Sequence, residues 1–133
     1  MRNTPISAHS YTRARENVTG RGAGLLERDV ERRLVNRLRA EVPAARCLKF
    51  MSPGCSGVPD RIILLPGGAV VFAELKRPGE KPRALQMAEH ERLRRLGFQV
   101  YGCVDSYDMV ETVVLYCRMV SACSRIGSEE VDP

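Results

Sequence analysis

The chain has 133 residues, of which 21 are Lys or Arg and 16 are Asp or Glu, so its formal net charge is +5. This length fits one domain around a single core and excludes a multidomain assembly. The 44% apolar and 28% charged residues are typical of a globular protein and exclude a disordered or low-complexity chain.

The sequence predicts a protein of the cytosol without a membrane partner. No segment approaches the ~20 consecutive apolar residues that a membrane-spanning helix needs, and residues 1–24 lack the apolar centre of a signal peptide. The five cysteines are an odd number and contain no C-x-x-C pair, which argues against a zinc cage or a disulfide framework. We therefore expect a cytoplasmic protein, located in the host cytosol if the chain is viral.

The first elements in chain order are a mobile basic arm over residues 1–23 and an amphipathic helix that starts near Leu25 and ends at Pro43. The arm combines Gly, Ser, Thr and Arg without periodicity. The helix is indicated by apolar residues at four-residue spacing, namely Leu26, Val30, Leu34 and Leu38.

A strand and a hairpin follow. Arg46–Met51 is a short strand candidate, and residues 52–59 form a Gly- and Pro-rich loop. Two apolar runs, Arg61–Leu65 and Ala69–Leu75, are separated by Pro66-Gly67-Gly68, which predicts an antiparallel hairpin. Both strands of the hairpin are expected to be buried.

The second half of the chain predicts a helix over Arg83–Leu96, a strand over 98–104 and a last helix over Tyr107–Met119. The first of these helices is expected to bury one face, made of Leu85, Ala88, Leu93 and Leu96. Residues 24–120 would form the folded domain, and residues 121–133 a polar tail. The order predicts an α/β fold with an α-β-β-β-α-β core, a mixed sheet flanked by helices.

Charged residues stand where the second hairpin strand ends. Because side chains alternate along a strand, Glu74 and Lys76 point to one face and Leu75 to the other, and the Leu75 carbonyl lies at the same edge. A Glu-x-Lys triplet is common by chance in a chain of this composition. Alone, this triplet decides nothing.

Asp60 is the second candidate at this edge. It lies six residues before Pro66, and Glu74 lies six residues after Gly68, so antiparallel pairing places the two carboxylates nearly opposite each other. Facing carboxylates repel unless a proton or cation lies between them. The alternative is that Asp60 is a turn residue paired with Arg61 or Lys76.

Two carboxylates and a carbonyl are hard oxygen ligands. Without a nearby His or Cys in the sequence, they suit Mg²⁺ or Mn²⁺ rather than zinc. A lysine beside such an ion can orient a water and stabilise the charge that develops on a phosphate. The set therefore indicates phosphodiester hydrolysis.

Three spaced motifs carry a family resemblance. Gly57-Val58-Pro59-Asp60, then Phe72-Ala73-Glu74-Leu75-Lys76, then Gln86 in the following helix resemble the PD-(D/E)XK nucleases, specifically the virus-type replication-repair nuclease (VRR-NUC) family. The resemblance extends from about Leu25 to Asp105. It implies metal ligation by Asp60, Glu74 and the Leu75 carbonyl, catalysis by Lys76, and support of the site or contact with substrate by Gln86.

The resemblance also places a glutamate on the first helix. Glu31 fits best, because it precedes Arg32-Arg33-Leu34 as that glutamate precedes such a run in similar chains. Glu27, one turn earlier, is the alternative, and an exposed salt bridge is the third interpretation. Glu31 is therefore the predicted third metal-binding carboxylate.

The function that these residues imply is a Mg²⁺- or Mn²⁺-dependent DNA endonuclease without a nucleotide cofactor. Similar stand-alone proteins suggest branched or Holliday-junction-like DNA, a homodimer, and a role in replication, repair or phage DNA processing. The alternatives are a catalytically inactive nucleic-acid-binding module of the same fold and a structural domain. Basic residues near the site could bind phosphates or be ordinary solvated charges: Lys49, Arg61, Arg77, Lys81 and Arg83.

Overall fold

The computed structural model describes residues 24–129, and it describes side chains up to residue 124. Their elements, in chain order, are helix α2 (Glu27–Glu41), strands β1 (Arg46–Lys49), β2 (Arg61–Leu64) and β3 (Val70–Leu75), helix α3 (Ala84–Arg95), strand β4 (Gln99–Val104) and helix α4 (Tyr107–Glu129). The predicted arm over residues 1–23 lies outside the described part. The α/β fold with a mixed sheet flanked by helices is confirmed.

Helix α2 forms where the four-residue apolar spacing predicts it. Val30, Leu34 and Leu38 are buried, and the Asp29 carboxylate accepts a hydrogen bond from the Leu26 N–H at 2.9 Å, which satisfies one of the free amides at the helix start. The helix ends before Pro43, whose ring prevents continuation.

The four strands form one sheet in the order β1-β2-β3-β4. The first three are antiparallel, and β4 joins β3 in parallel after the crossover through α3. Gly67 and Gly68 have φ angles of 89° and 91°, which allow the tight turn between β2 and β3. The predicted hairpin is confirmed.

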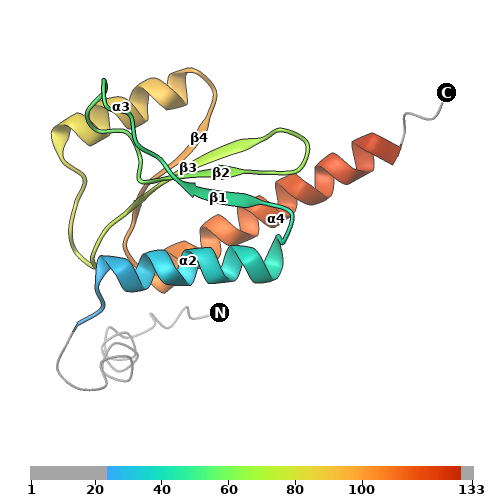
Figure 1. The fold of residues 1–133 in the computed structure, drawn as a ribbon, viewed down its shortest axis with the longest axis horizontal. Coiled ribbons are helices and arrows are strands. Elements are labelled where there is room, and N and C mark those ends of the chain that lie inside the picture. Colours follow the sequence, from blue (N-terminus) through green and yellow to red (C-terminus); the bar gives the residue numbers. More distant parts are fainter. Residues whose placement is uncertain (1–23, 130–133) are drawn as a thin grey trace, which may run out of the picture.

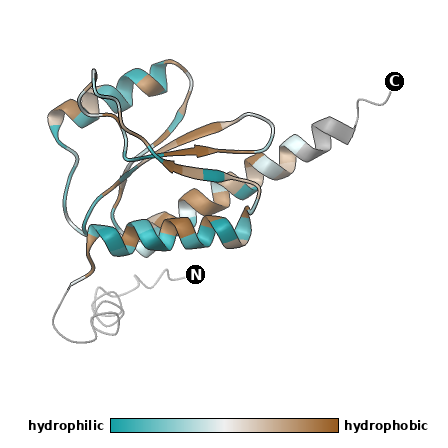
Figure 2. Ribbon diagram, in the orientation of Figure 1, coloured by the Kyte–Doolittle hydropathy of each residue, from teal (hydrophilic) through white to brown (hydrophobic). Residues whose placement is uncertain are grey.

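The helices form two layers around the sheet (Figure 1). The α2 and α4 helices pack together on one face, where their apolar residues meet Ile63, Val71, Ala73 and Leu75 in the main core. Helix α3 contacts β4 from the opposite side. Figure 2 shows that the strands are largely hydrophobic and that hydrophilic residues alternate along α2. The alternation of side chains therefore gives β3 an apolar face toward α2 and α4, and a second face toward α3.

The predicted packing face of α3 is wrong. Leu85 and Leu96 are 67% and 74% exposed, whereas Gln86 and His90 are buried. The reason is that α3 covers the face of the sheet that carries Glu74, so its inward side chains are polar partners for a carboxylate. Hydrophobicity alone selects the wrong side of such a helix.

Helix α4 is longer than the sequence predicts. It continues ten residues past Met119, so the predicted domain boundary at residue 120 falls inside a helix. Ser121 is buried, and Ser124 lies against the β2–β3 turn, where a Cβ on Gly67 would come within 1.8 Å of the Ser124 hydroxyl oxygen. No helix in residues 24–129 combines the length and hydrophobicity needed to cross a membrane.

Candidate active site

The β2–β3 hairpin brings Asp60 and Glu74 to the same end of the sheet. Arg61 pairs with Ala73, so one step further along the register Asp60 stands beside Glu74. The Asp60 carboxylate accepts a hydrogen bond from the Leu75 N–H at 2.9 Å. Asp60 is therefore fixed to the end of β3 by the main chain, and the turn alternative, in which it pairs with Arg61 or Lys76, is not what the structure shows.

Glu74 is the most enclosed charged group of this site, with 1% of its surface exposed. Its Oε1 accepts a hydrogen bond from Gln86 Nε2 at 2.7 Å. Its Oε2 is buried without a hydrogen-bond partner, and His90 Nε2 lies 3.8 Å away. Burial, and then the negative charge of Asp60, raise the pKa of Glu74 to about 7.

Lys76 lies on the same face as Glu74, as the alternation along β3 predicts. Its Nζ is 3.4 Å from Glu74 Oε1 and 3.8 Å from a carboxylate oxygen of Glu80. Its main-chain N–H donates to the Val104 carbonyl at 3.0 Å, which continues the β3–β4 pairing past the end of the strand. Lys76 is only 6% exposed, and its ammonium group lies between the two carboxylates.

Gln86 is fixed at both ends of its amide. Its Oε1 accepts the Arg83 N–H at 2.8 Å, which satisfies a free donor at the start of α3, and its Nε2 donates to Glu74. Helix formation and the position of the Glu74 carboxylate thus depend on the same side chain. Its predicted place beside the site is therefore found in the structure.

The donor set fits a hard divalent cation. Asp60 and Glu74 supply carboxylate oxygens next to each other, and Glu74 Oε2 is a buried oxygen without a partner. Leu75 ends β3 between Glu74 and Lys76, and its side chain is buried in the core. In the described part of the chain, no three His, Cys, Asp or Glu side chains are clustered as a metal site. Two carboxylates, a carbonyl and waters are ligands that suit Mg²⁺, which keeps several waters in proteins.

The two candidate glutamates of α2, Glu27 and the predicted Glu31, have different surroundings. Burial, and then the charge of Asp60, raise the pKa of Glu27, while Lys76 lowers it, so Glu27 lies in the electrostatic field of the site. Glu31 instead forms an ion pair with Arg61 Nη2. Four residues, about 6 Å along the helix axis, separate the two glutamates, so both lie on the same face of α2.

The predicted phosphate-binding cations differ in their surroundings. Arg61 is engaged by Glu31 and donates to the Cys47 carbonyl, so it is an internal partner between α2 and the sheet rather than a free surface charge. Arg77 pairs with Glu80 at 3.0 Å. The exposed members of the predicted set are Lys49, Arg77, Lys81 and Arg83.

His90 is a site residue that the sequence analysis did not assign to the site. It follows Gln86 by four residues, so the two side chains lie on the same face of α3, one turn apart. Burial lowers the pKa of His90, and the nearby Arg94 lowers it further. The signal that could have found it is this spacing from Gln86, which an apolar count along the helix does not register.

Gly57 joins the loop before Asp60 to the start of α3. Its φ is +89°, and a Cβ would come within 2.6 Å of the Leu85 carbonyl oxygen. We expect Gly57→Ala to lower the free energy of unfolding by at least about 2 kcal/mol, from the left-handed backbone and the clash with main chain. Urea unfolding of the metal-free protein measures this change.

Gly54→Ala is the matched control in the same loop. Nothing lies within 4 Å of its Cβ position, and its φ is not in the left-handed region. Its expected change is within about 0.5 kcal/mol. Equal stability of the two variants would show that the Gly57 contact with α3 does not contribute to the fold.

The fold and this site define an α/β nuclease domain. A solved structure described as a VRR_NUC domain superposes with a TM-score of 0.60 and 32% sequence identity, over 68% of this chain and 95% of that one. The chain is also 47% identical over 83 residues to "Putative nuclease p44" of Acyrthosiphon pisum secondary endosymbiont phage 1, which covers 62% of this chain and 86% of that protein. No family model matches the chain.

The protein belongs to the VRR-NUC family of nucleases, as the identity and coverage of these two matches establish. The family resemblance drawn from the three motifs is confirmed. A nuclease fold of this kind implies a divalent metal in general terms.

Proposed function

We propose that the protein is a metal-dependent DNA endonuclease that acts on branched DNA. The observation that carries the proposal is the buried carboxylate of Glu74, placed beside Asp60 and held 3.4 Å from the Lys76 ammonium. A binding module would gain nothing from two adjacent carboxylates, because they repel phosphate. Mg²⁺ is the favoured ion and Mn²⁺ the second, since both prefer oxygen ligands.

In the proposed reaction, Asp60, Glu74 and the Leu75 carbonyl would hold the ion. A divalent ion at this position would lower the pKa of a bound water and neutralise charge on the scissile phosphate. Lys76 Nζ orients the attacking water and stabilises the negative charge that develops on the phosphate. The water oxygen adds to phosphorus, one P–O ester bond breaks, and a proton derived from the water ends on the departing oxygen, which leaves one strand end with a phosphate and the other with a hydroxyl.

Gln86 and His90 act through Glu74. Gln86 keeps one carboxylate oxygen oriented, and His90 borders the other. Second partners of this kind fix the direction of a ligating carboxylate. Both are therefore proposed as positioning residues rather than catalytic ones.

The test is cleavage of labelled four-way junction, flap and linear duplex DNA by the purified chain. We expect cutting with Mg²⁺ or Mn²⁺, none with EDTA, and a higher rate on the branched substrates than on the linear duplex. Binding of all three DNAs without cutting in either metal would favour a catalytically inactive binding module. A sedimentation measurement on the same sample tests the homodimer that a two-fold symmetric junction would match.

Glu27 is the proposed third acidic group, and exchanging it should matter more than exchanging Glu31. We expect Glu27→Gln to raise the Mg²⁺ concentration required for half-maximal cleavage by about tenfold, because a charge that faces Asp60 and Lys76 is lost. Glu31→Gln should leave this concentration within about twofold and should lower stability instead, by about 1–3 kcal/mol, because Arg61 loses its partner.

Each variant is measured in two ways, by cleavage at increasing Mg²⁺ concentration and by urea unfolding. The two measurements separate the metal requirement from the stability of the fold. If Glu31→Gln shifts the metal requirement and Glu27→Gln does not, the third carboxylate is Glu31 after all.

A further inference from the structure

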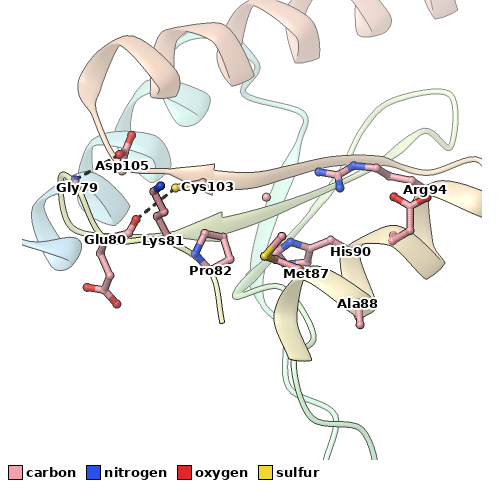
Figure 3. A pocket seen from close by; sticks show the side chains of 12 residues that line it. Gly79, Glu80, Lys81, Pro82, Met87, Ala88, His90, Arg94, Cys103 and Asp105 are labelled. Carbon is pink, nitrogen blue, oxygen red and sulfur yellow. Dashed lines mark hydrogen bonds between the residues drawn. The ribbon is translucent and has the colours of Figure 1, made fainter. Parts of the chain in front are cut away.

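A groove lies beside the active site, between α3, β4 and the loop that connects β3 to α3 (Figure 3). Its volume of about 860 Å³ is within the ~300–1,000 Å³ range of pockets that hold small organic ligands. It is therefore large enough for a few nucleotides and too small for a duplex. The reaction described above does not use it.

The groove borders the catalytic centre through two of its lining residues. His90 lines it, and its Nε2 lies 3.8 Å from Glu74 Oε2. Glu80 also lines it, and its carboxylate lies 3.8 Å from Lys76 Nζ. The groove is therefore adjacent to the centre, at the distance of neighbouring side chains.

The surface of the groove suits unstacked bases. Pro82 and Met87 give it apolar walls, and Met87 is 59% exposed. On the other side, Gly102 allows β4 to approach α3, because a Cβ there would come within 2.9 Å of His90 Nδ1. Bases of a duplex are stacked inside the helix and cannot reach such walls, whereas unpaired bases stack and pack on exposed side chains.

The charges of the groove suit a polyanion. Lys81 and Arg94 line it, and neither forms an ion pair within residues 24–124. Among the described residues, the Arg94 side chain donates to the Val100 carbonyl alone. Figure 3 places Lys81 and Arg94 at opposite ends of the groove, with Met87 and His90 between them.

The carboxylates that line the groove already have partners. Glu80 pairs with Arg77 at 3.0 Å, and Glu91 pairs with Arg95 at 3.5 Å. Asp105 is paired only with the Gly79 main-chain N–H, at 3.5 Å. Most of the negative charge is thus compensated, while the two cations remain available.

We propose that this groove binds an unpaired DNA strand next to the cleaved bond, with the bases on the Met87 wall and phosphates at Lys81 and Arg94. The proposal rests on the nuclease function proposed above and adds the part of the substrate that it recognises. A branched or flapped DNA offers such a strand and a continuous duplex does not, so the groove gives a physical basis for selectivity.

The decisive variant is Met87→Glu, compared with Met119→Glu on α4. The two methionines are 59% and 58% exposed, so both changes add one surface carboxylate at equal cost to the fold, but only Met87 lines the groove. Binding is measured by fluorescence anisotropy in EDTA, with a labelled 15-nucleotide oligo-dT and a 15-base-pair duplex as probes. Because no cleavage occurs in EDTA, the result does not depend on catalysis.

We expect Met87→Glu to weaken oligo-dT binding about tenfold and duplex binding less than twofold, while Met119→Glu changes neither. Lys81→Ala should weaken oligo-dT binding and lower its salt slope by about one. Circular dichroism melting confirms that each variant is folded.

Equal affinities of the two methionine variants for oligo-dT would overturn the proposal. So would a loss of duplex binding by Met87→Glu as large as its loss of oligo-dT binding. If the variants bind as expected but wild type cuts no DNA with either metal, the groove proposal stands and the nuclease function fails. If wild type cuts branched and linear DNA at one rate that Met87→Glu does not alter, the nuclease function stands and the groove fails.

Discussion

Replacing Lys76 by methionine is expected to lower metal-dependent cleavage by a factor of about 10² to 10³ while leaving DNA binding in EDTA nearly unchanged. The ammonium is the one cation within 4 Å of the Glu74 carboxylate among the described Lys and Arg side chains, and the loss of a group that stabilises a developing negative charge has an effect of this size. Single-turnover rates at saturating Mg²⁺ measure the chemical step directly. Methionine keeps the apolar stem, so packing around the nearly buried side chain is preserved.

Lys76→Arg is the informative control. It conserves the charge, but the planar guanidinium is larger and places its donors differently, so cleavage by Lys76→Arg should stay well below the wild-type rate. A rate for Lys76→Met within about threefold of wild type would mean that the lysine is a structural partner of Glu74 and Glu80, and that the proposed mechanism is wrong.

Glu74→Gln is expected to have opposite effects on activity and stability. Cleavage should fall by a factor of about 10² or more, because the buried carboxylate is the central oxygen ligand of the proposed metal site. At the same time, the metal-free protein should become more stable above pH 7, because glutamine has the same shape and carries no charge into the buried site.

The pH dependence follows from the direction of the Glu74 pKa. Its pKa is raised from 4.5 to about 7 in the folded state, so between these pH values the folded state binds more protons than the unfolded state. The stability that protonated Glu74 contributes is complete below about pH 4.5 and is lost as the pH rises through 7. The loss in free energy of unfolding is at most about 3 kcal/mol.

Urea unfolding in EDTA at pH 5.5 and pH 8.5 tests this expectation. Wild type should lose stability between the two, and Glu74→Gln should lose distinctly less. Glu111→Gln is the control, because Glu111 is a surface carboxylate paired with Arg37 at 2.7 Å and its removal should leave the slope with pH unchanged. A wild-type slope that Glu74→Gln does not change would show that another group dominates the titration.

The sequence was sufficient where structure depends on local patterns. The Pro66-Gly67-Gly68 turn sets the hairpin register, and counting from it places Asp60 beside Glu74, as found. Alternation along β3 places Glu74 and Lys76 on one face. These relations depend only on chain connectivity and backbone geometry, which the order of residues records.

The sequence does not show in the same way how elements that are distant along the chain face each other. Glu27 and Glu31 lie one turn apart on α2, and only the direction in which the helix meets the sheet decides which faces Asp60. The α3 packing face was wrong for a related reason, since the helix packs on a carboxylate and its inward residues are Gln86 and His90. Hydrophobic periodicity assumes that a helix covers an apolar surface.

Helix α3 carries two residues that contact the Glu74 carboxylate and, beside them, a groove residue that is exposed. Gln86 and His90 contact the Glu74 carboxylate, and His90 also lines the groove, whereas the exposed Met87 lines the groove alone. A substitution at Met87 leaves both contacts of the Glu74 carboxylate intact, whereas a substitution at Gln86 or His90 removes one of them. The groove wall at Met87 can thus change, and with it the DNA shape that the proposed groove would select, without a change at the acid.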